Sequence, residues 1–166
     1  MALLALAARW GDSRLRAHEF DALVNAITDS QATAAHADEF VYSTRSYTMP
    51  QLISSSSAVV RSGLAELIDR SAAEGASQLA QERSAIAAIT VLPWHHDVRA
   101  ARARYLGYLD ARLAALDKVA HGGDLVAIPH AVDTPALQQA RAALLAAAPS
   151  AAQRQRAQAA LADPGR

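Results

Sequence analysis

The densest group of side chains able to do chemistry is the tetrapeptide Trp94-His95-His96-Asp97, which directly follows Pro93. Imidazole and carboxylate groups bind divalent metal ions, and imidazole also titrates near pH 6.5. Because neighbouring residues of a helix point in different directions, both histidines reach one ion only where a turn helps them. We take His95, His96 and Asp97 as candidate metal ligands or pH-sensitive contacts. The alternative is an ordinary surface turn in which Asp97 stabilises the start of the next helix.

Arginines gather just after this tetrapeptide, at Arg99, Arg102 and Arg104. They are candidate contacts for a phosphate, a lipid headgroup or an acidic protein partner. The more common explanation is a solvated helix face or pairing within the chain, because residues 1–90 carry 7 basic and 10 acidic residues and residues 91–166 carry 9 and 6. The formal net charge is zero, whereas nucleic-acid modules usually show a strong basic excess. We expect no nucleic-acid partner.

The sequence lacks the familiar catalytic and cofactor motifs. None of the six histidines has an acidic residue three positions earlier, as a di-iron carboxylate bundle requires. Cysteine is absent, which excludes disulfides, thiolate metal sites and a cysteine nucleophile. The serine run 54–57 has no nucleophile elbow, and no phosphate-binding glycine motif occurs. We predict no cofactor and no catalytic activity. An enzyme whose residues meet only in the folded chain is the remaining alternative.

The composition predicts one domain with a thin core. Of 166 residues, 42 are alanine, whereas Leu, Val, Ile and Phe together account for 36. Small side chains let helices approach closely, and alanine-rich faces leave shallow grooves that a partner helix can fill. The composition therefore favours helices that pack on one another or on a partner.

Periodic apolar residues predict a first helix from Asp12 to about Tyr47. Ser30 and Gln31 interrupt its apolar stripe, as a polar layer inside a bundle does. The stripe consists of Phe20, Leu23, Val24, Ile27, Ala34, Ala37 and Val41.

A second helix is predicted to begin at Thr48, because Thr48 to Gln51 matches a capping box with Pro50 in the first turn. Pro93 is expected to end or kink this helix. The serine run and two glycines, Gly63 and Gly75, weaken the prediction, although glycines on an inner face also permit close packing. The expected stripe is Ile53, Val60, Leu64, Leu67, Ile68, Leu79, Ile86 and Ile89.

A third helix is predicted from about Trp94 to His121, where Gly122-Gly123 stops it. Residues 124–133 are expected to form an extended crossover on the bundle. Pro135 begins a fourth helix, and Ser150 to Gln153 is a second capping box that opens a short fifth helix. The expected inward residues are Val98, Tyr105, Leu109, Leu113, Leu116, Val119, Leu137, Leu144 and Leu145, with Arg99, Arg102, Arg104 and Arg112 off the stripe.

The first residues have two interpretations. Met1 to Ala8 carry no charge, and Trp10 follows among arginines Arg9, Arg14 and Arg16. This arrangement is typical of a membrane–water boundary, so residues 1–11 are interpreted either as a docked first turn or as the remnant of a membrane anchor. Membrane association through residues 1–10 is one expectation, and it slightly favours a membrane-associated location.

Together these patterns predict an all-α protein, an antiparallel three- to four-helix bundle with a short C-terminal helical pair. The expected parts are the apolar segment 1–11, the three-helix core 12–121, the crossover 122–134, and short helices with a frayed tail in 135–166. We expect a non-catalytic helical interaction module in a membrane-associated or multi-subunit assembly, with a protein partner or a second copy of the chain. The alternative is a small-ligand, metal or pH-sensing bundle centred on the Trp94–Asp97 turn.

Overall fold

A computed structural model of the protein describes residues 2–121 and 135–161; of residues 2–9, 38 and 45 it describes only the backbone. This part of the chain contains five helices and no strand. The prediction of an all-α bundle is confirmed. The helices are α1 (Ala2–Ser54), α2 (Ala58–Ala88), α3 (His96–Ala120), α4 (Pro135–Ala147) and α5 (Ala151–Ala160).

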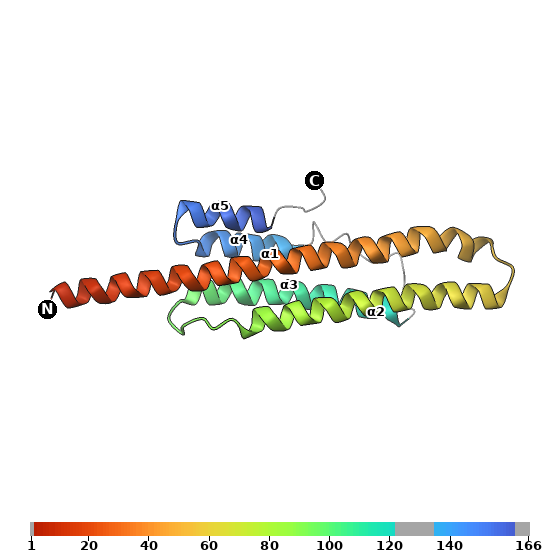
Figure 1. The fold of residues 1–166 in the computed structure, drawn as a ribbon, viewed down its shortest axis with the longest axis horizontal. Coiled ribbons are helices and arrows are strands. Elements are labelled where there is room, and N and C mark those ends of the chain that lie inside the picture. Colours follow the sequence, from red (N-terminus) through yellow and green to blue (C-terminus); the bar gives the residue numbers. More distant parts are fainter. Residues whose placement is uncertain (1, 122–134, 162–166) are drawn as a thin grey trace.

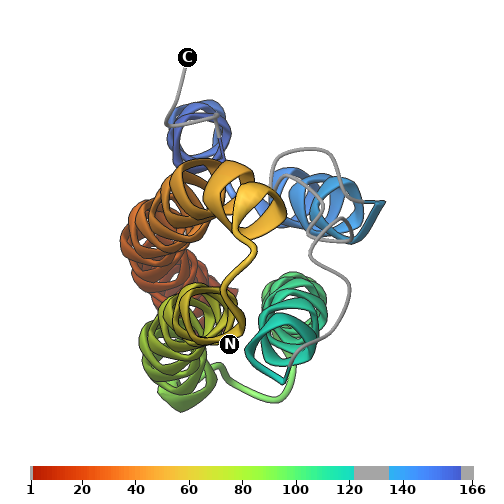
Figure 2. The same ribbon diagram turned by 90° about the vertical axis from the view of Figure 1, so that its right-hand side faces the viewer.

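The helices lie side by side along one axis (Figure 1). α1 and α2 form a long antiparallel hairpin, α3 packs along α2, and α4 packs along α3. α5 folds back from α4 and lies on the outer side of α1 (Figure 2). The α1–α2 hairpin is much longer than the other helices, so one end of it extends beyond α3.

The apolar stripe of the first helix is confirmed completely. Each of its seven residues is buried, and none is more than 3% exposed. The polar layer is also present, because the buried Ser30 accepts a hydrogen bond from the Tyr105 hydroxyl and Gln31 donates another to that hydroxyl. On the other helices Ile68, Leu79, Ile86, Val98, Leu109, Leu116, Val119, Leu137 and Leu144 are buried as predicted.

The predicted break between the first two helices is wrong. α1 continues through Thr48 and Pro50 to Ser54, and the Thr48 hydroxyl donates to the carbonyl oxygen of Thr44 instead of capping a helix. The chain turns within the serine run, where hydroxyl groups compete for backbone partners. Ser57 is the true N-cap of α2, and its side chain accepts a hydrogen bond from the Val60 amide.

The end of the second helix also differs from the prediction. α2 stops at Ala88, and Ile89 already has an extended backbone. The β-branched Ile89, Thr90 and Val91 precede Pro93 here, and such side chains are poor helix formers. The chain then crosses to α3 in a short irregular segment. Residues 122–134 and 162–166, with the predicted crossover and frayed tail, lie outside the described residues.

Several apolar residues predicted to face inward are exposed near the α1–α2 turn. Ile53 is 77% exposed, and Val60 and Leu67 are each almost half exposed. The pattern is helical, but α3 does not reach this part of the hairpin. Conversely, Arg112 is predicted to lie off the buried stripe but is only 6% exposed. Burial lowers the pKa of its guanidinium to about 10.

Candidate functional site

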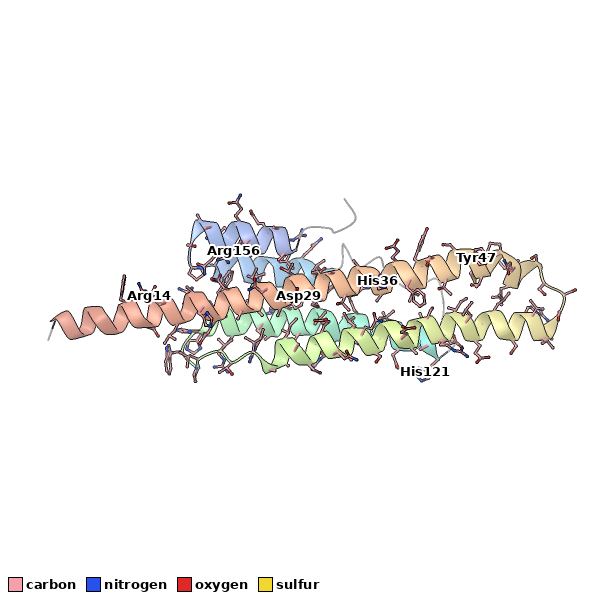
Figure 3. All side chains as sticks on the ribbon, viewed as in Figure 1. Arg14, Asp29, His36, Tyr47, His121 and Arg156 are labelled. Atoms are coloured by element: carbon pink, nitrogen blue, oxygen red, sulfur yellow. The ribbon has the colours of Figure 1, made fainter. Side chains whose placement is uncertain are left out.

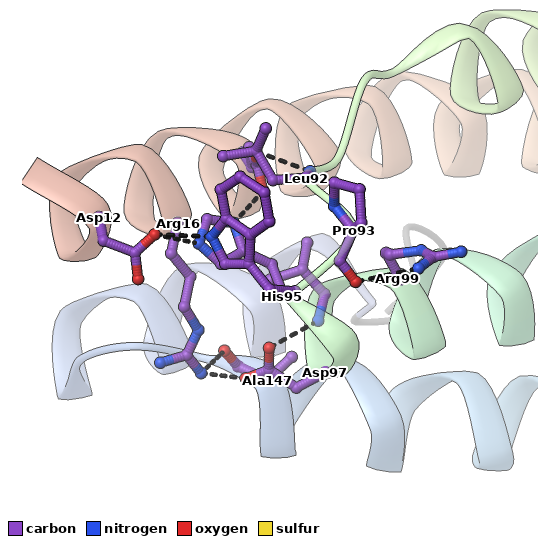
Figure 4. Close-up of polar contacts among 11 residues, drawn as sticks. Asp12, Arg16, Leu92, Pro93, His95, Asp97, Arg99 and Ala147 are labelled. Carbon is purple, nitrogen blue, oxygen red and sulfur yellow. Dashed lines mark hydrogen bonds and ion pairs between the residues drawn. The ribbon is translucent and has the colours of Figure 1, made fainter.

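The candidate site centres on His95, which the turn between α2 and α3 carries into contact with α1. The His95 side chain is only 3% exposed. Its Nδ1 atom lies 2.6 Å from Oε2 of Glu19, and its Nε2 atom lies 3.2 Å from Oδ1 of Asp12 (Figure 4). Both imidazole nitrogens therefore face carboxylates of α1.

α1 presents these acids from one face. Asp12, Arg16 and Glu19 are spaced by four and three residues, so their side chains lie above one another on the helix. The same face holds the α2–α3 turn through two further bonds. The indole nitrogen of Trp94 donates to Oδ1 of Asp12 at 2.8 Å, and the Leu92 amide donates to Oε1 of Glu19 at 3.0 Å.

The electrostatics of this cluster favour the charged forms of its members. Burial alone disfavours a charged imidazole, but hydrogen bonds and negative charge from Glu19 and Asp12 outweigh it, so the pKa of His95 is raised above its ordinary 6.5. The hydrogen bond from Trp94, followed by the contacts with His95 and the charge of Arg16, lowers the pKa of Asp12 despite partial desolvation. The two shifts have the signs expected of an ion pair.

Arg16 extends the same contact to α3 and α4. Its guanidinium pairs with Asp97 in the first turn of α3, and Nη2 also donates to the carbonyl oxygen of Ala147 at 3.3 Å, near the end of α4 (Figure 4). A single face of α1 thus holds the α2–α3 turn and the end of α4. We call this group of contacts, from Asp12, Arg16, Glu19, Trp94, His95 and Asp97, the His95 cluster.

The three candidate metal ligands face different partners. His95 contacts Glu19 and Asp12, Asp97 pairs with Arg16, and His96 is exposed. Across residues 2–121 and 135–161, no group of three or more histidine or acidic side chains is placed to hold a metal ion. The geometry of the turn instead joins it to α1.

The three candidate arginines all make hydrogen bonds within the chain. Arg99 donates to the carbonyl oxygen of Pro93 at 3.0 Å, and Arg102 donates to that of Ile89. Arg104 reaches Oε1 of Gln139 on α4 at 3.4 Å. Arg99 and Arg102 thereby fasten the irregular segment before α3. Contact of these arginines with an acidic partner or a headgroup stays a prediction.

No known protein family matches this chain, and neither do the curated proteins nor the solved structures with which it was compared. The site is therefore interpreted from its own geometry. In the described part of the chain no helix has both the length and the apolar character needed to cross a membrane.

Sequence reasoning found His95 but missed both of its partners. Glu19 and Asp12 precede it by 76 and 83 residues, and no local spacing connects them. The available signal was the repeat of Asp12, Arg16 and Glu19 along α1 beside the apolar stripe. Such a polar row next to a core face indicates a helix that holds another segment through side-chain contacts.

Proposed function

We propose that this protein is a non-catalytic helical interaction module that associates with a second copy of itself through the far end of the α1–α2 hairpin. We define this hairpin end as residues 46–67. The observation that carries the proposal is the exposure of its large apolar side chains. Tyr47 is 75% exposed, Ile53 is 77% exposed and Val59 is 82% exposed.

The hairpin end is uncovered because α3 is too short to reach it. A Cβ atom added at Gly75 of α2 would lie 3.9 Å from Cδ1 of Leu116 of α3, which places these two residues opposite each other. Four residues of α3 follow Leu116, whereas α2 continues for seventeen residues from Gly75 to Ala58. At 1.5 Å per residue, about 20 Å of the hairpin lies beyond the end of α3.

The apolar stripe of α2 continues along this uncovered length. Ile68 is the last fully buried residue of the stripe, and Leu64 and Val60 follow it toward the turn at helical spacing. Nearer the centre of the molecule α3 covers the same face. A second helical hairpin would cover the exposed length in the same manner and complete a four-helix arrangement.

Charge favours a second copy as the occupant. Residues 46–60 contain no Asp, Glu, Lys, Arg or His, and the rest of the hairpin end carries one residue of each sign, Arg61 and Glu66. A symmetric dimer brings the same surface of both chains together, so a charged patch would repel itself and a neutral one does not. Tyr47 lies at this end of the molecule, far from Arg14 at the other (Figure 3), so two copies can meet here without contact between the ends that carry Arg14.

Sedimentation velocity over a range of concentrations tests the proposal, with the double variant I53E/V59E. Both side chains are exposed, so the variant should keep its helical circular dichroism. The expected result is a concentration-dependent dimer of the wild-type chain. In the same buffer, the dimer dissociation constant of I53E/V59E should be at least about tenfold higher, since burying an unpaired charge costs more than about 1.4 kcal/mol.

The control is L15E, which places one such charge on an exposed leucine outside the hairpin end. We expect its dimer to be unchanged. A wild-type chain that sediments as a monomer at every concentration contradicts the proposal. Equal weakening by L15E would place the interface elsewhere.

A second candidate function is pH sensing by the His95 cluster. It is favoured by the position of a nearly buried imidazole between two carboxylates, with a pKa raised above its ordinary value. Loss of the proton weakens the attachment of the α2–α3 turn to α1. The pH dependence of stability described in the Discussion tests this candidate independently of self-association.

A further inference from the structure

Both tryptophans of the chain lie at the same end of the molecule, opposite the hairpin end. The indole nitrogen of Trp94 is bonded to Asp12, which is only two residues from Trp10 in α1. Two residues of a helix span about 3 Å along its axis, so the indoles lie at nearly one level. Trp10 is 66% exposed and Trp94 is 58% exposed. We call this level of the molecule the tryptophan end.

Trp94 combines a bonded polar group with an exposed apolar ring. Its polar N–H group is satisfied by Asp12, while much of the ring remains open to the surroundings. Tryptophan is enriched at membrane–water interfaces because it combines an apolar ring with one polar edge. A tryptophan that merely filled the core would have its ring covered by other helices.

α1 extends beyond the tryptophan end as a helix with apolar sequence. It begins at Ala2, ten residues before Asp12, and residues 2–8 carry no charge. These ten residues span about 15 Å. In Figure 1 this part of α1 projects past the α2–α3 turn and past α4 and α5. An apolar helical segment that projects beyond the bundle has no other helix of this chain beside it. Contact with an apolar medium or a partner would remove its surface from water.

The charges at the tryptophan end suit an anionic surface. Asp97 is paired with Arg16, Glu19 is only 11% exposed beside His95, and Asp12 contacts both Trp94 and His95. The guanidinium of Arg14 lies 3.8 Å from the centre of the Trp10 ring, and Arg14 is exposed. Asp12 and Asp97 are 48% and 38% exposed, but each acid is engaged by a partner within the protein, while an arginine stacked on an exposed indole faces outward.

We propose that the tryptophan end docks on a lipid bilayer, with residues 2–8 of α1 inserted, Trp10 and Trp94 at headgroup depth, and Arg14 at the phosphates. Short apolar helices and paired tryptophan and arginine side chains are the groups that enter the interfacial region of a bilayer. A bilayer is favoured over a protein partner because both indoles lie at one level of the bundle axis but project from different segments of the chain. The hairpin end then points away from the lipid.

The test uses the full chain with the substitution W10F, which leaves Trp94 as the only tryptophan. Vesicles of phosphatidylcholine and phosphatidylglycerol are prepared with and without brominated acyl chains. We expect the protein to sediment with the vesicles, Trp94 emission to shift to shorter wavelength, and the brominated lipid to quench it. Trp94 lies 84 residues along the sequence from position 10, so quenching reports on the folded arrangement.

Arginine substitutions show which end faces the lipid. Arg14→Gln should lower partitioning into the anionic vesicles about fivefold, because each arginine near such a surface contributes a fixed attraction. Arg61→Gln, the matched control at the hairpin end, should leave partitioning unchanged. Vesicles of phosphatidylcholine alone should bind the wild-type chain more weakly.

Three results would overturn the proposal. The first is a wild-type chain that does not sediment with either vesicle. The second is binding without quenching of Trp94, which would show that the folded bundle stays away from the lipid. The third is an effect of Arg61→Gln equal to that of Arg14→Gln, which would assign the contact to the opposite end.

Discussion

Oε2 of Glu19 lies 2.6 Å from Nδ1 of His95, although 76 residues separate the two in sequence. This contact joins the middle of the chain to the long first helix. It also places a nearly buried imidazole where its charge is favoured. The α2–α3 turn is irregular, so its position depends on such side-chain contacts more than on backbone pairing.

Stability should fall as the pH rises through the pKa of His95. The folded pKa lies above the ordinary value of 6.5, so the folded chain binds the proton more tightly than the unfolded chain. The resulting stabilisation is fully present below about pH 6.5 and is lost as the pH passes the folded pKa. Chemical denaturation at a series of pH values between about 6 and 9 measures this change.

The control is His95→Gln, in which the pH dependence over this range should flatten. An equal slope in the variant would assign the titration to another group.

At acidic pH Asp12 affects stability in the opposite sense. Its folded pKa lies below 3.8, so its contribution is present above 3.8 and is lost as the pH falls through the folded value.

Removal of the buried imidazole of His95 should destabilise the protein more than removal of the exposed imidazole of His96. His95→Ala leaves the Glu19 carboxylate, which is 11% exposed, without its positively charged partner and with only the Leu92 amide as a donor. A cost of about 2–4 kcal/mol is expected, because a largely buried charge loses its compensation. His96→Ala, at an exposed position, should change the free energy of unfolding by less than about 0.5 kcal/mol. Urea denaturation compares the two.

Gly75 and Gly63 should respond differently to larger side chains. A Cβ atom at Gly75 would lie 3.2 Å from Cβ of Ala37, whereas at Gly63 nothing lies within 4 Å. Gly63→Ala should stabilise α2 by about 0.5–1 kcal/mol through helix propensity alone. Gly75→Val should cost about 1–3 kcal/mol, because the β-carbon of Ala37 cannot rotate away. Thermal unfolding of both variants tests this, and equal responses would mean that α1 and α2 are not in close contact there.

The two buried tyrosines of α3 form another matched pair. Tyr105→Phe removes hydrogen bonds with Ser30 and Gln31 and should cost about 1–2 kcal/mol. The Tyr108 hydroxyl is buried and makes no hydrogen bond of normal geometry with the residues described, although Gln31 lies close enough to interact with it. Tyr108→Phe should therefore be neutral or slightly stabilising. A larger loss in Tyr108→Phe than in Tyr105→Phe would contradict the polar layer described here.

Gln153 should hold α5 on α1. Its Nε2 atom donates to the carbonyl oxygen of Ala17 at 3.1 Å and to Oδ1 of Asp21 at 2.9 Å. Gln153→Ala should speed amide hydrogen exchange in α5 while leaving α2 and α3 protected. Gln155→Ala, an exposed position on the same helix, is the control and should have no effect. Uniformly faster exchange throughout the bundle would indicate general destabilisation instead.

The sequence predicted the helical core well because burial follows the helical period. Phe20, Ile27 and Leu109 are fully buried, as their spacing indicates. The pattern could not predict how far each face is covered, since that depends on where a different helix ends. Ile53 and Val60 keep the period of a buried stripe, but α3 stops short of them.

Two sequence features near the end of α1 each predicted where the helix stops, and they gave different positions. Thr48 and Gln51 satisfy the capping pattern, yet Pro50 near the end of a helix costs only one hydrogen bond, and the following serines break the helix instead. At the candidate site, the sequence could identify His95 as a titratable group. It could not predict the contact with Glu19, because only the folding of the hairpin brings them together.

The uninterrupted course of α1 has a geometric consequence. A single helix of 53 residues contributes to the His95 cluster near one end and reaches the turn into α2 at the other. Each added residue in such a rod advances its far portion by about 1.5 Å and rotates it by roughly 100°. The direction in which side chains point at one end of α1, relative to the other end, is therefore set by the number of residues between the two ends.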